Sequence, residues 1–175
     1  MNGKHFSQYG INFRLVDNLV DVEKLRSTRN LPHVKKQMFN QEEISPEMQK
    51  KWFHQLDNSK NFYFIYGLNL VDIGVINITN VDFLLGIGDA GIYVANEDYF
   101  GSHFNIGALL FLYGYAFEIL KLRSIRARIL PSNAKAIRMN LSLGFKLVSN
   151  EENTYLLKKY DYNQTTLKFE RFFNY

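Results

Sequence analysis

The segment 133–145 constrains the fold more than any other part of the chain. Asn133 has the side chain preferred at a helix N-cap, and Ile137 and Leu141 then recur at helical spacing. Gly144 is placed to take the left-handed conformation that ends a helix, and the aromatic residue after it can fold back on the last turn. The segment therefore predicts a capped amphipathic helix that ends abruptly and leads into a strand.

Hydrophobic periodicity predicts the other elements. The expected helices are residues 18–29, 32–38, 45–56, 106–120 and 133–143. The expected strands are residues 11–16, 62–68, 72–81, 91–94, 124–130, 146–149, 155–158 and 166–173. This order predicts an α/β (α+β) fold, with a mixed sheet and helices on both of its faces.

Composition excludes several classes of protein. The chain has 175 residues, of which 46% are hydrophobic. We therefore expect residues 1–175 to form one domain with a sizeable core. The absence of cysteine excludes disulfides, thiolate metal sites and a cysteine nucleophile. A net charge of +4 suits an anionic ligand. The sequence contains no dense Lys/Arg stripe, so we do not expect it to bind nucleic acid. No signal segment or long apolar run is present, so we expect a cytoplasmic protein without a membrane partner.

The string from Asn133 to Phe145, with Asn-x-x-Ala-Ile followed by Leu-Gly-Phe, resembles the last motif of the GNAT superfamily of acyl-CoA-dependent N-acetyltransferases. The order of elements resembles the GNAT order along nearly the whole chain. The resemblance implies a central mixed, mostly antiparallel sheet, acetyl-CoA as co-substrate, and direct acetyl transfer to a primary amine in a ternary complex. The four histidines lack metal-ligand spacing, so no metal is expected.

The resemblance assigns the coenzyme to the strand 91–94, to the loop after it and to the N-terminus of the next helix. Unpaired N–H groups and the helix dipole favour an anion there, and an exposed strand edge can pair with the two pantetheine amides. The expected coenzyme-binding residues are Ile92, Tyr93, Val94, Gly101, Ser102, His103, Phe104, Asn105, Ile106, Gly107, Asn133, Ala136 and Asn140.

This loop departs from the family pattern Arg/Gln-x-x-Gly-x-Gly/Ala. The Tyr-Ala-Phe sequence that begins at Tyr115 resembles a family motif and fixes the alignment of this loop. In that alignment the Arg/Gln, the Gly and the Gly/Ala of the pattern fall on Phe100, His103 and Asn105, and none of the three residues matches. Two interpretations follow. Either the loop backbone still binds pyrophosphate, with Ser102, His103 or Asn105 adding donors, or the domain is a degenerate GNAT fold that acts as a non-catalytic binding protein.

Aminolysis of a thioester needs a neutral amine, a polarised carbonyl and a route for the proton. Asp89, four residues before Tyr93, is the first candidate for a general base, and the alternative is a turn aspartate without a catalytic role. Asn140 stands where many GNAT members have a tyrosine that protonates the CoA thiolate. Because asparagine is a poor proton donor, Tyr93 or a water is the alternative source. The expected catalytic residues are Asp89, Tyr93 and Asn140.

The N-terminal third carries a second resemblance. Arg29-Asn30, Val34-x-x-x-Met38 and Ile44-Ser45-x-Glu47 resemble the GNAT branch that acetylates UDP-linked 4-amino-4,6-dideoxy sugars in the pseudaminic acid pathway. This resemblance implies a nucleotide-linked amino sugar as acceptor, with basic residues at the diphosphate and apolar ones on the sugar or uracil. The expected substrate-binding residues are Arg29, Asn30, Lys35, Met38, Phe39 and Trp52, of which the last three are alternatively core residues.

Other acceptors and assemblies stay open at the level of sequence. A protein N-terminus or a polyamine is the alternative acceptor, although Glu42-Glu43 is the only acidic pair near the acceptor helices and a polyamine site favours more. The aromatic tail 169–175 either completes the sheet, which we prefer, or pairs between the subunits of a homodimer.

Overall fold

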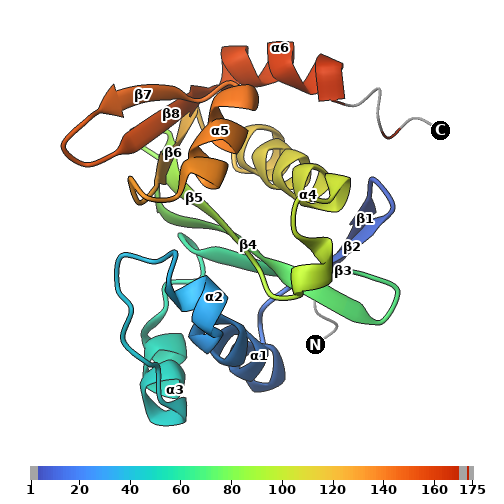
Figure 1. The fold of residues 1–175 in the computed structure, drawn as a ribbon, viewed down its shortest axis with the longest axis vertical. Coiled ribbons are helices and arrows are strands. Elements are labelled where there is room, and N and C mark those ends of the chain that lie inside the picture. The colour runs from blue at the N-terminus through green and yellow to red at the C-terminus, as the bar shows by residue number, and fades with distance from the viewer. Residues whose placement is uncertain (1–3, 170–172, 174–175) are drawn as a thin grey trace.

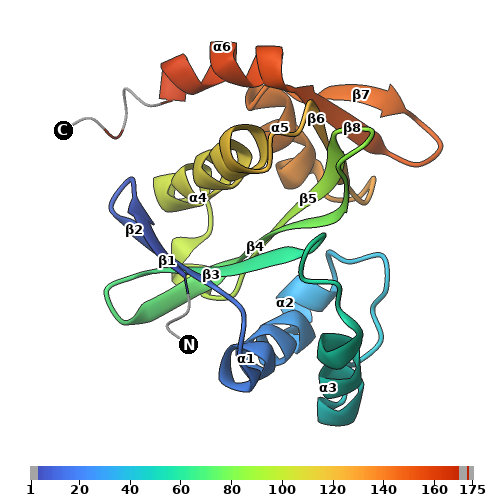
Figure 2. The same ribbon diagram turned by 180° about the vertical axis from the view of Figure 1, so that it is seen from behind.

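The computed structural model describes residues 4–169 and 173, with the side chain of residue 167 excepted (Figures 1 and 2). The strands are β1 (His5–Gln8), β2 (Ile11–Leu15), β3 (Phe62–Leu68), β4 (Val71–Asp82), β5 (Ile87–Val94), β6 (Ser124–Arg128), β7 (Lys146–Ser149) and β8 (Thr154–Lys158). The helices are α1 (Leu19–Asn30), α2 (Pro32–Lys35), α3 (Pro46–Gln55), α4 (His103–Gly114), α5 (Ala134–Ser142) and α6 (Lys159–Phe169). A 3-10 turn, Glu97–Tyr99, precedes α4, and a π-helical turn, Tyr115–Ile119, follows it.

The eight strands form one sheet in the order β1-β2-β3-β4-β5-β6-β8-β7. Every neighbouring pair is antiparallel except β5 and β6, which are parallel. The predicted mixed, mostly antiparallel sheet is therefore confirmed. The hairpin of β1 and β2 was not expected, and it turns through Tyr9 and Gly10, both of which have a positive φ.

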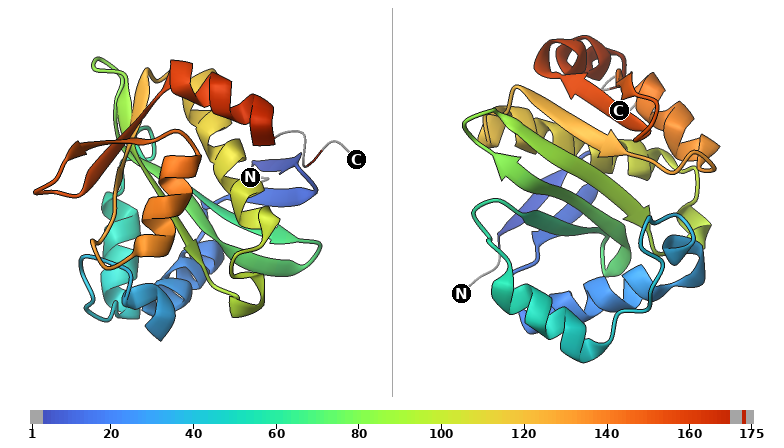
Figure 3. Two further views of the ribbon diagram at one scale, coloured as in Figure 1. Left: turned by 45° about the horizontal axis from the view of Figure 1, so that its top comes forward. Right: turned by 90° about the vertical axis from the view of Figure 1, so that its left-hand side faces the viewer.

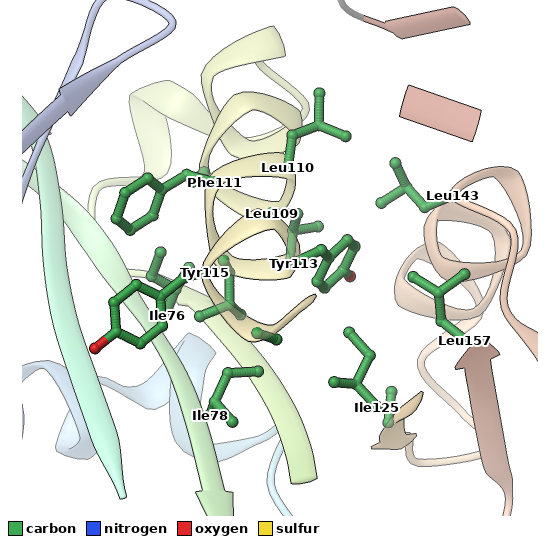
Figure 4. Packing of buried hydrophobic residues seen from close by; sticks show 14 of the residues in the cluster. Ile76, Ile78, Leu109, Leu110, Phe111, Tyr113, Tyr115, Ile125, Leu143 and Leu157 are labelled. Carbon is green, nitrogen blue, oxygen red and sulfur yellow. The ribbon is translucent and has the colours of Figure 1, made fainter. Parts of the chain in front are cut away.

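Helices cover both faces of the sheet, as predicted (Figure 3). On one face, α1 and α3 enclose a small core of Val16, Val22, Leu25, Ile65 and Val75. On the other face, α4 is buried on nearly all sides from Ala108 to Tyr113, because its sequence is apolar all round. Leu143 of α5 and Leu157 of β8 close the larger core around α4 (Figure 4).

The helix predicted from Asn133 is confirmed with its cap and its stop. The Ala136 amide donates to Asn133 Oδ1 at 3.1 Å, and Gly144 ends the helix with a φ of 93°. At Gly74 the backbones of β4 and β5 approach closely, because a Cβ there would lie 2.4 Å from the Tyr93 carbonyl oxygen.

The predicted strand 166–173 is wrong where the structure describes it. Residues 159–169 form α6, and the Thr166 hydroxyl donates to the Tyr162 carbonyl one turn earlier at 2.9 Å. Strand β8, which precedes α6 directly, already pairs with β6 and β7 and has no free edge. Helix α6 packs through Tyr162 on Phe117 instead. Phe169 therefore does not complete the sheet, and residues 170–172, 174 and 175 lie outside the described part of the chain.

Candidate active site

The site begins where β5 and β6 separate. Their parallel pairing extends over three registers, the last of which joins Asp89 to Arg126, whereas β5 continues to Val94. Beyond Asp89 the described residues of β6 offer no pairing partner to β5. The edge of β5 that faces β6 is therefore open over Ala90 to Val94.

The open edge presents the backbone groups of alternate residues. The Ala95 amide donates to the Ile73 carbonyl at 2.8 Å, so the Ala95 backbone faces β4. Because neighbouring residues of an antiparallel strand direct their N–H and C=O groups to opposite sides, Ile92 and Val94 face away from β4. A ligand with amide groups can thus add to this edge as a further strand does.

The open edge leads into the N-terminus of α4. Ser102 occupies the N-cap position without a side-chain cap bond, and its hydroxyl is buried without a hydrogen-bond partner among the described residues. The first amides of a helix have no partner within the helix, and an anion satisfies them. A buried orphan hydroxyl beside these amides fits a pyrophosphate group. At the neighbouring Gly101, which has a φ of 74°, nothing lies within 4 Å of the place that a Cβ would occupy, so the backbone there is open to approach.

Asn105 does not have the orientation expected of a pyrophosphate ligand. Its side chain is buried, accepts a hydrogen bond from the Tyr66 hydroxyl at 2.8 Å and donates to the Tyr99 carbonyl at 2.8 Å. Asn105 therefore fastens the loop before α4 to the core. Gly107 also faces inward, because a Cβ there would lie 2.9 Å from the Ile11 side chain.

The remaining predicted coenzyme residues divide between the surface and the core. His103 is exposed and lies against the Phe104 ring with a centroid distance of 4.0 Å. Phe104, Ile106, Ile92 and Val94 pack their side chains on the larger core, so only their backbone groups can serve a ligand.

The two asparagines of α5 have different surroundings. Asn133 uses its side-chain oxygen in the cap and is partly exposed, which leaves the amide nitrogen available to a ligand. Asn140 is buried, and its amide nitrogen donates to the Ala136 carbonyl of the same helix at 2.9 Å. The geometry therefore gives no support to Asn140 as a proton donor, while Ala136 packs on the larger core.

Asp89 stands at the point of separation and has partners on both carboxylate oxygens. Arg126 Nε lies 2.8 Å from Oδ1, and Asn80 Nδ2 lies 3.0 Å from Oδ2. The side chain is about one-quarter exposed, at 28%, so these contacts fix it while leaving one side open.

Tyr93 points to the other face of the sheet from Ile92 and Val94, where it packs on the smaller core beside Trp52, Phe53 and Tyr63. Burial raises the pKa of its hydroxyl, the neighbouring Tyr63 adds to the shift, and Arg29 opposes it only in part. The hydroxyl is consequently protonated at neutral pH and is a hydrogen-bond donor.

Arg29 and Asn30 hold the loop between α2 and α3, residues 36–45. Arg29 Nη2 donates to the Asn40 carbonyl, and Asn30 exchanges two hydrogen bonds with the Ile44 backbone, at 2.8 and 2.9 Å. Asn30 is thus committed to the loop. Arg29 Nη1, by contrast, is buried and has no hydrogen-bond partner among the described residues. A buried guanidinium nitrogen without an acceptor is costly, so a ligand oxygen would stabilise it.

The same loop reaches the end of β6. Phe39 is 54% exposed, and the Arg128 guanidinium lies 5.1 Å from the centre of its ring. Met38 and Lys35 are partly exposed on the approach to this contact. Phe39 is therefore a surface residue near the end of β6, whereas Trp52 packs edge-on against Tyr63 at 5.2 Å and belongs partly to the core.

An open pocket of about 400 Å³ lies at the ends of β3 and β4. Its walls combine two aromatic rings with hydroxyl, amide and carboxylate groups from Trp52, Gln55, Leu56, Asp57, Asn61, Tyr63, Thr79 and Asn80. Asn80 connects it to Asp89, so the pocket adjoins the point where β5 and β6 separate.

A sequence profile described as an acetyltransferase (GNAT) domain matches residues 11–146. The chain belongs to this family. The matched region contains the open edge of β5, the N-terminus of α4 and all of α5.

Solved structures agree with the GNAT fold. The apo form of FdhC, described as a nucleotide-linked sugar GNAT, has a TM-score of 0.80 at 18% identity and covers 98% of this chain and 99% of its own. Spermidine N-acetyltransferase from Vibrio cholerae, in complex with CoA and spermine, has a TM-score of 0.77 at 15% identity, with 89% and 99% covered. A domain from Methanocaldococcus jannaschii scores 0.74 at 21% identity, with 89% and 99% covered. No curated protein sequence matches the chain significantly.

In this GNAT domain, the sequence did not identify Arg126 or Asn80, the two residues that contact the Asp89 carboxylate. Arg126 alternates with buried residues in its strand, which predicts only that it faces outward. Its contact with Asp89 depends on the register between β5 and β6, which no local pattern reveals. Within residues 4–169 and 173, no group of three His, Asp or Glu side chains is arranged to hold a metal ion. None of the helices in this part of the chain has the length and the apolar character that a membrane span requires.

Proposed function

We propose that this GNAT acetyltransferase transfers acetyl from acetyl-CoA to the primary amine of a nucleotide-linked amino sugar, directly and in a ternary complex. One observation carries the proposal: the open edge of β5 leads into an α4 N-terminus where the buried hydroxyl of Ser102 has no hydrogen-bond partner in the described part of the chain. An extended ligand with amides along its arm and a pyrophosphate at its end matches both features.

Acetyl-CoA supplies an activated thioester when it is bound. The chain contributes the backbone groups of Ile92 and the Val94 amide toward the arm, since the Val94 carbonyl contacts His33. From α5 it contributes the Asn133 amide nitrogen. At the pyrophosphate end it contributes the first amides of α4 and the Ser102 hydroxyl, with His103 at the rim. Because most of these donors are backbone groups, the loss of the family's loop glycines does not by itself remove the site.

The amine approaches from the face covered by α1 and α3. There Asp89 accepts the amine proton, through a water, while Arg126 and Asn80 hold its carboxylate at the separation of the strands. Tyr93 points to the same face and keeps its proton, so it serves as a hydrogen-bond donor.

An anionic acceptor agrees with the charges around the α2–α3 loop. Three basic residues form no ion pair with any described residue: Arg29, Lys35 and Arg128. In addition, Arg29 Nη1 has no hydrogen-bond acceptor among the described residues. Phosphate oxygens suit guanidinium groups. The likeness to FdhC points the same way, whereas the likeness to a spermidine acetyltransferase keeps a polyamine as the alternative.

The first test is calorimetric titration of the protein with acetyl-CoA. We expect micromolar binding that Ser102→Ala weakens several-fold, because the buried hydroxyl is removed. Ser142→Ala is the matched control, since that hydroxyl bonds only within α5. No binding up to millimolar acetyl-CoA would show that the domain is a degenerate GNAT fold.

The role of Asp89 has its own test. Asp89→Asn should lower kcat by about 100-fold or more and leave the acetyl-CoA Kd nearly unchanged, as expected for loss of a general base. Asp161→Asn is the control, because it removes another ion-paired carboxylate, at 2.7 Å from Lys146, outside the site. A variant as fast as the parent across the pH range would remove Asp89 from the mechanism.

A further inference from the structure

His33 reaches from α2 to the segment that joins the open edge of β5 to α4. Its Nε2 lies 3.1 Å from the Val94 carbonyl oxygen and its Nδ1 lies 3.1 Å from Glu97 Oε1. The ring also meets Phe100 edge-on, with a centroid distance of 5.3 Å and an interplanar angle of 76°. One imidazole therefore touches the beginning, the middle and the end of residues 94–100.

The chemistry of the two contacts defines the hydrogen bonds. A backbone carbonyl and a carboxylate only accept, so a ring nitrogen can form a hydrogen bond with either of them only as a donor. The imidazolium ion satisfies both partners, whereas the neutral ring satisfies one. The Glu97 side chain is 66% exposed, so its contact with His33 contributes little to the stability of residues 94–100. The bond to the Val94 carbonyl is partly buried and is the stronger restraint.

The bond between His33 and the Val94 carbonyl lies at the end of the strand edge proposed for the coenzyme. Val94 is the last residue of β5 whose backbone faces the open edge, and after it only the amides of Ala95 and Asn96 attach the segment to β4, both through the Ile73 carbonyl. The 3-10 turn Glu97–Tyr99 then leads to Ser102 at the start of α4. The segment thus sets the distance between the edge proposed for the arm and the helix terminus proposed for the pyrophosphate.

We propose that His33 is a positioning residue for the coenzyme site. By fixing the Val94 carbonyl and the turn after it, His33 holds the strand edge and the α4 N-terminus in one geometry before the ligand arrives. Preorganisation of this kind raises affinity because the ligand does not have to order the segment. The inference depends on the proposed use of this site by a CoA ligand.

His33 also connects the two sides of the site. It follows Arg29 by four residues, and α2 lies with α1 and α3 on the acceptor face of the sheet (Figure 1). The coenzyme segment is therefore restrained from the acceptor side, by an element that continues into the α2–α3 loop.

The test is a calorimetric titration with CoA of the parent and four variants. His33→Ala should bind CoA about tenfold more weakly, the effect of losing one partly buried hydrogen bond. His33→Gln keeps an N–H donor at about the reach of Nε2 and should restore most of the affinity. Glu97→Gln should weaken binding by about threefold or less, because the ion pair is exposed. Asp98→Asn is the matched control, since Asp98 is an exposed acid of the same turn that does not contact His33.

A second measurement separates positioning from plain stability. The melting temperature of each variant is recorded without ligand, and amide hydrogen exchange is followed at residues 95–102. We expect His33→Ala to keep a melting temperature near that of the parent while exchange in this segment becomes faster. Faster exchange without loss of global stability is what a local restraint predicts.

The outcomes are distinguishable. If the parent binds CoA and His33→Ala binds it equally or more tightly, the positioning role is overturned while the proposed function stands. If His33→Ala melts much lower and its folded fraction binds normally, His33 is only a structural residue. If the parent itself does not bind CoA, the proposed function fails and the inference about His33 fails with it.

Discussion

At the scale of single residues, the sharpest pH dependence is expected from Asp72. Arg14 donates to both of its carboxylate oxygens, at 2.9 and 3.0 Å, and Lys24 adds a contact at 2.9 Å. Burial alone would raise the pKa of Asp72, but the bonds from Arg14 and Lys24 outweigh it and hold the pKa below its ordinary value.

A depressed pKa gives the sign of the effect. The stabilisation is fully present above the pKa of the unfolded aspartate, about 3.9, and is lost as the pH falls through the lower folded value. We therefore expect the melting temperature of the parent to fall more steeply below about pH 4 than that of Asp72→Asn. The measurement is thermal unfolding monitored by circular dichroism between about pH 7 and pH 2.5. Parallel curves for the two proteins would contradict the prediction.

Asn133 permits a test that separates a helix cap from a ligand contact. Asn133→Ala should cost about 1 kcal/mol of unfolding free energy through the lost cap and weaken acetyl-CoA binding roughly tenfold. Asn133→Ser keeps an oxygen that can cap the helix but removes the amide nitrogen. We expect the serine variant to recover stability in urea titrations without recovering affinity in calorimetry. Normal affinity in either folded variant would leave Asn133 with the cap alone.

At the scale of elements, the end of α5 has a specific steric requirement. Gly144 has a φ of 93°, and a Cβ there would lie 2.7 Å from Thr165 Oγ1 of α6 and 3.3 Å from Leu157 of β8. The glycine therefore serves both the left-handed turn and the close packing of α6. Gly144→Ala should lower the free energy of unfolding by about 3 kcal/mol, since backbone strain and overpacking add.

Gly10 provides the comparison for Gly144. Its φ is 72°, but nothing lies within 4 Å of a Cβ at that position. Gly10→Ala should therefore cost only the backbone strain, about 1 to 2 kcal/mol. Equal losses for the two variants in urea denaturation would mean that the contact with α6 contributes nothing.

At the scale of the whole molecule, charge is expected to choose between acceptor classes. The chain carries a net charge of +4, and the basic groups Arg29, Arg128 and Lys35 surround the α2–α3 loop without ion-pair partners among the described residues. A UDP-linked amino sugar should therefore be acetylated with a higher kcat/KM than spermidine. That kcat/KM should fall several-fold between about 0.05 and 0.5 M salt, because salt screens the attraction.

The charge prediction has two checks. Arg128→Gln should raise the KM for the nucleotide sugar and flatten its salt dependence, while Arg138→Gln, a variant of a surface arginine of α5, should do neither. A clear preference for spermidine over the nucleotide sugar would contradict the anionic-acceptor proposal and favour the polyamine alternative.

Much of the fold could be predicted because its signals are local. The cap at Asn133 and the glycine at 144 indicated α5, and the period of the apolar residues indicated the central strands and most of α4. The prediction of a strand at residues 166–173 was wrong for a non-local reason. Its threonine and aromatic residues favour a strand, but β8 has a neighbour on each side and residues 166–169 continue helix α6 instead.

The candidate site divides in the same way. The strand, the loop and the helix that follow one another in residues 91–107 could be predicted from the order of elements, and the family resemblance points to this segment as the proposed coenzyme site. The inward orientation of Asn105 and the internal bond of Asn140 could not be predicted, because helical position alone does not show which side faces the core. His33 had no distinguishing pattern among four unclustered histidines, since its partners are 61 and 64 positions away in sequence.

The sequence alone therefore determined the family resemblance, the order of the elements and the caps that delimit them, because these depend on neighbours within a few residues. The tertiary structure decided where β5 leaves β6, which polar groups are used up inside the fold and which are left open. It also decided that Asp89 meets Arg126 and that His33 meets Val94. These pairings depend on strand register and on the docking of α2, and both are set by the packing of the whole core.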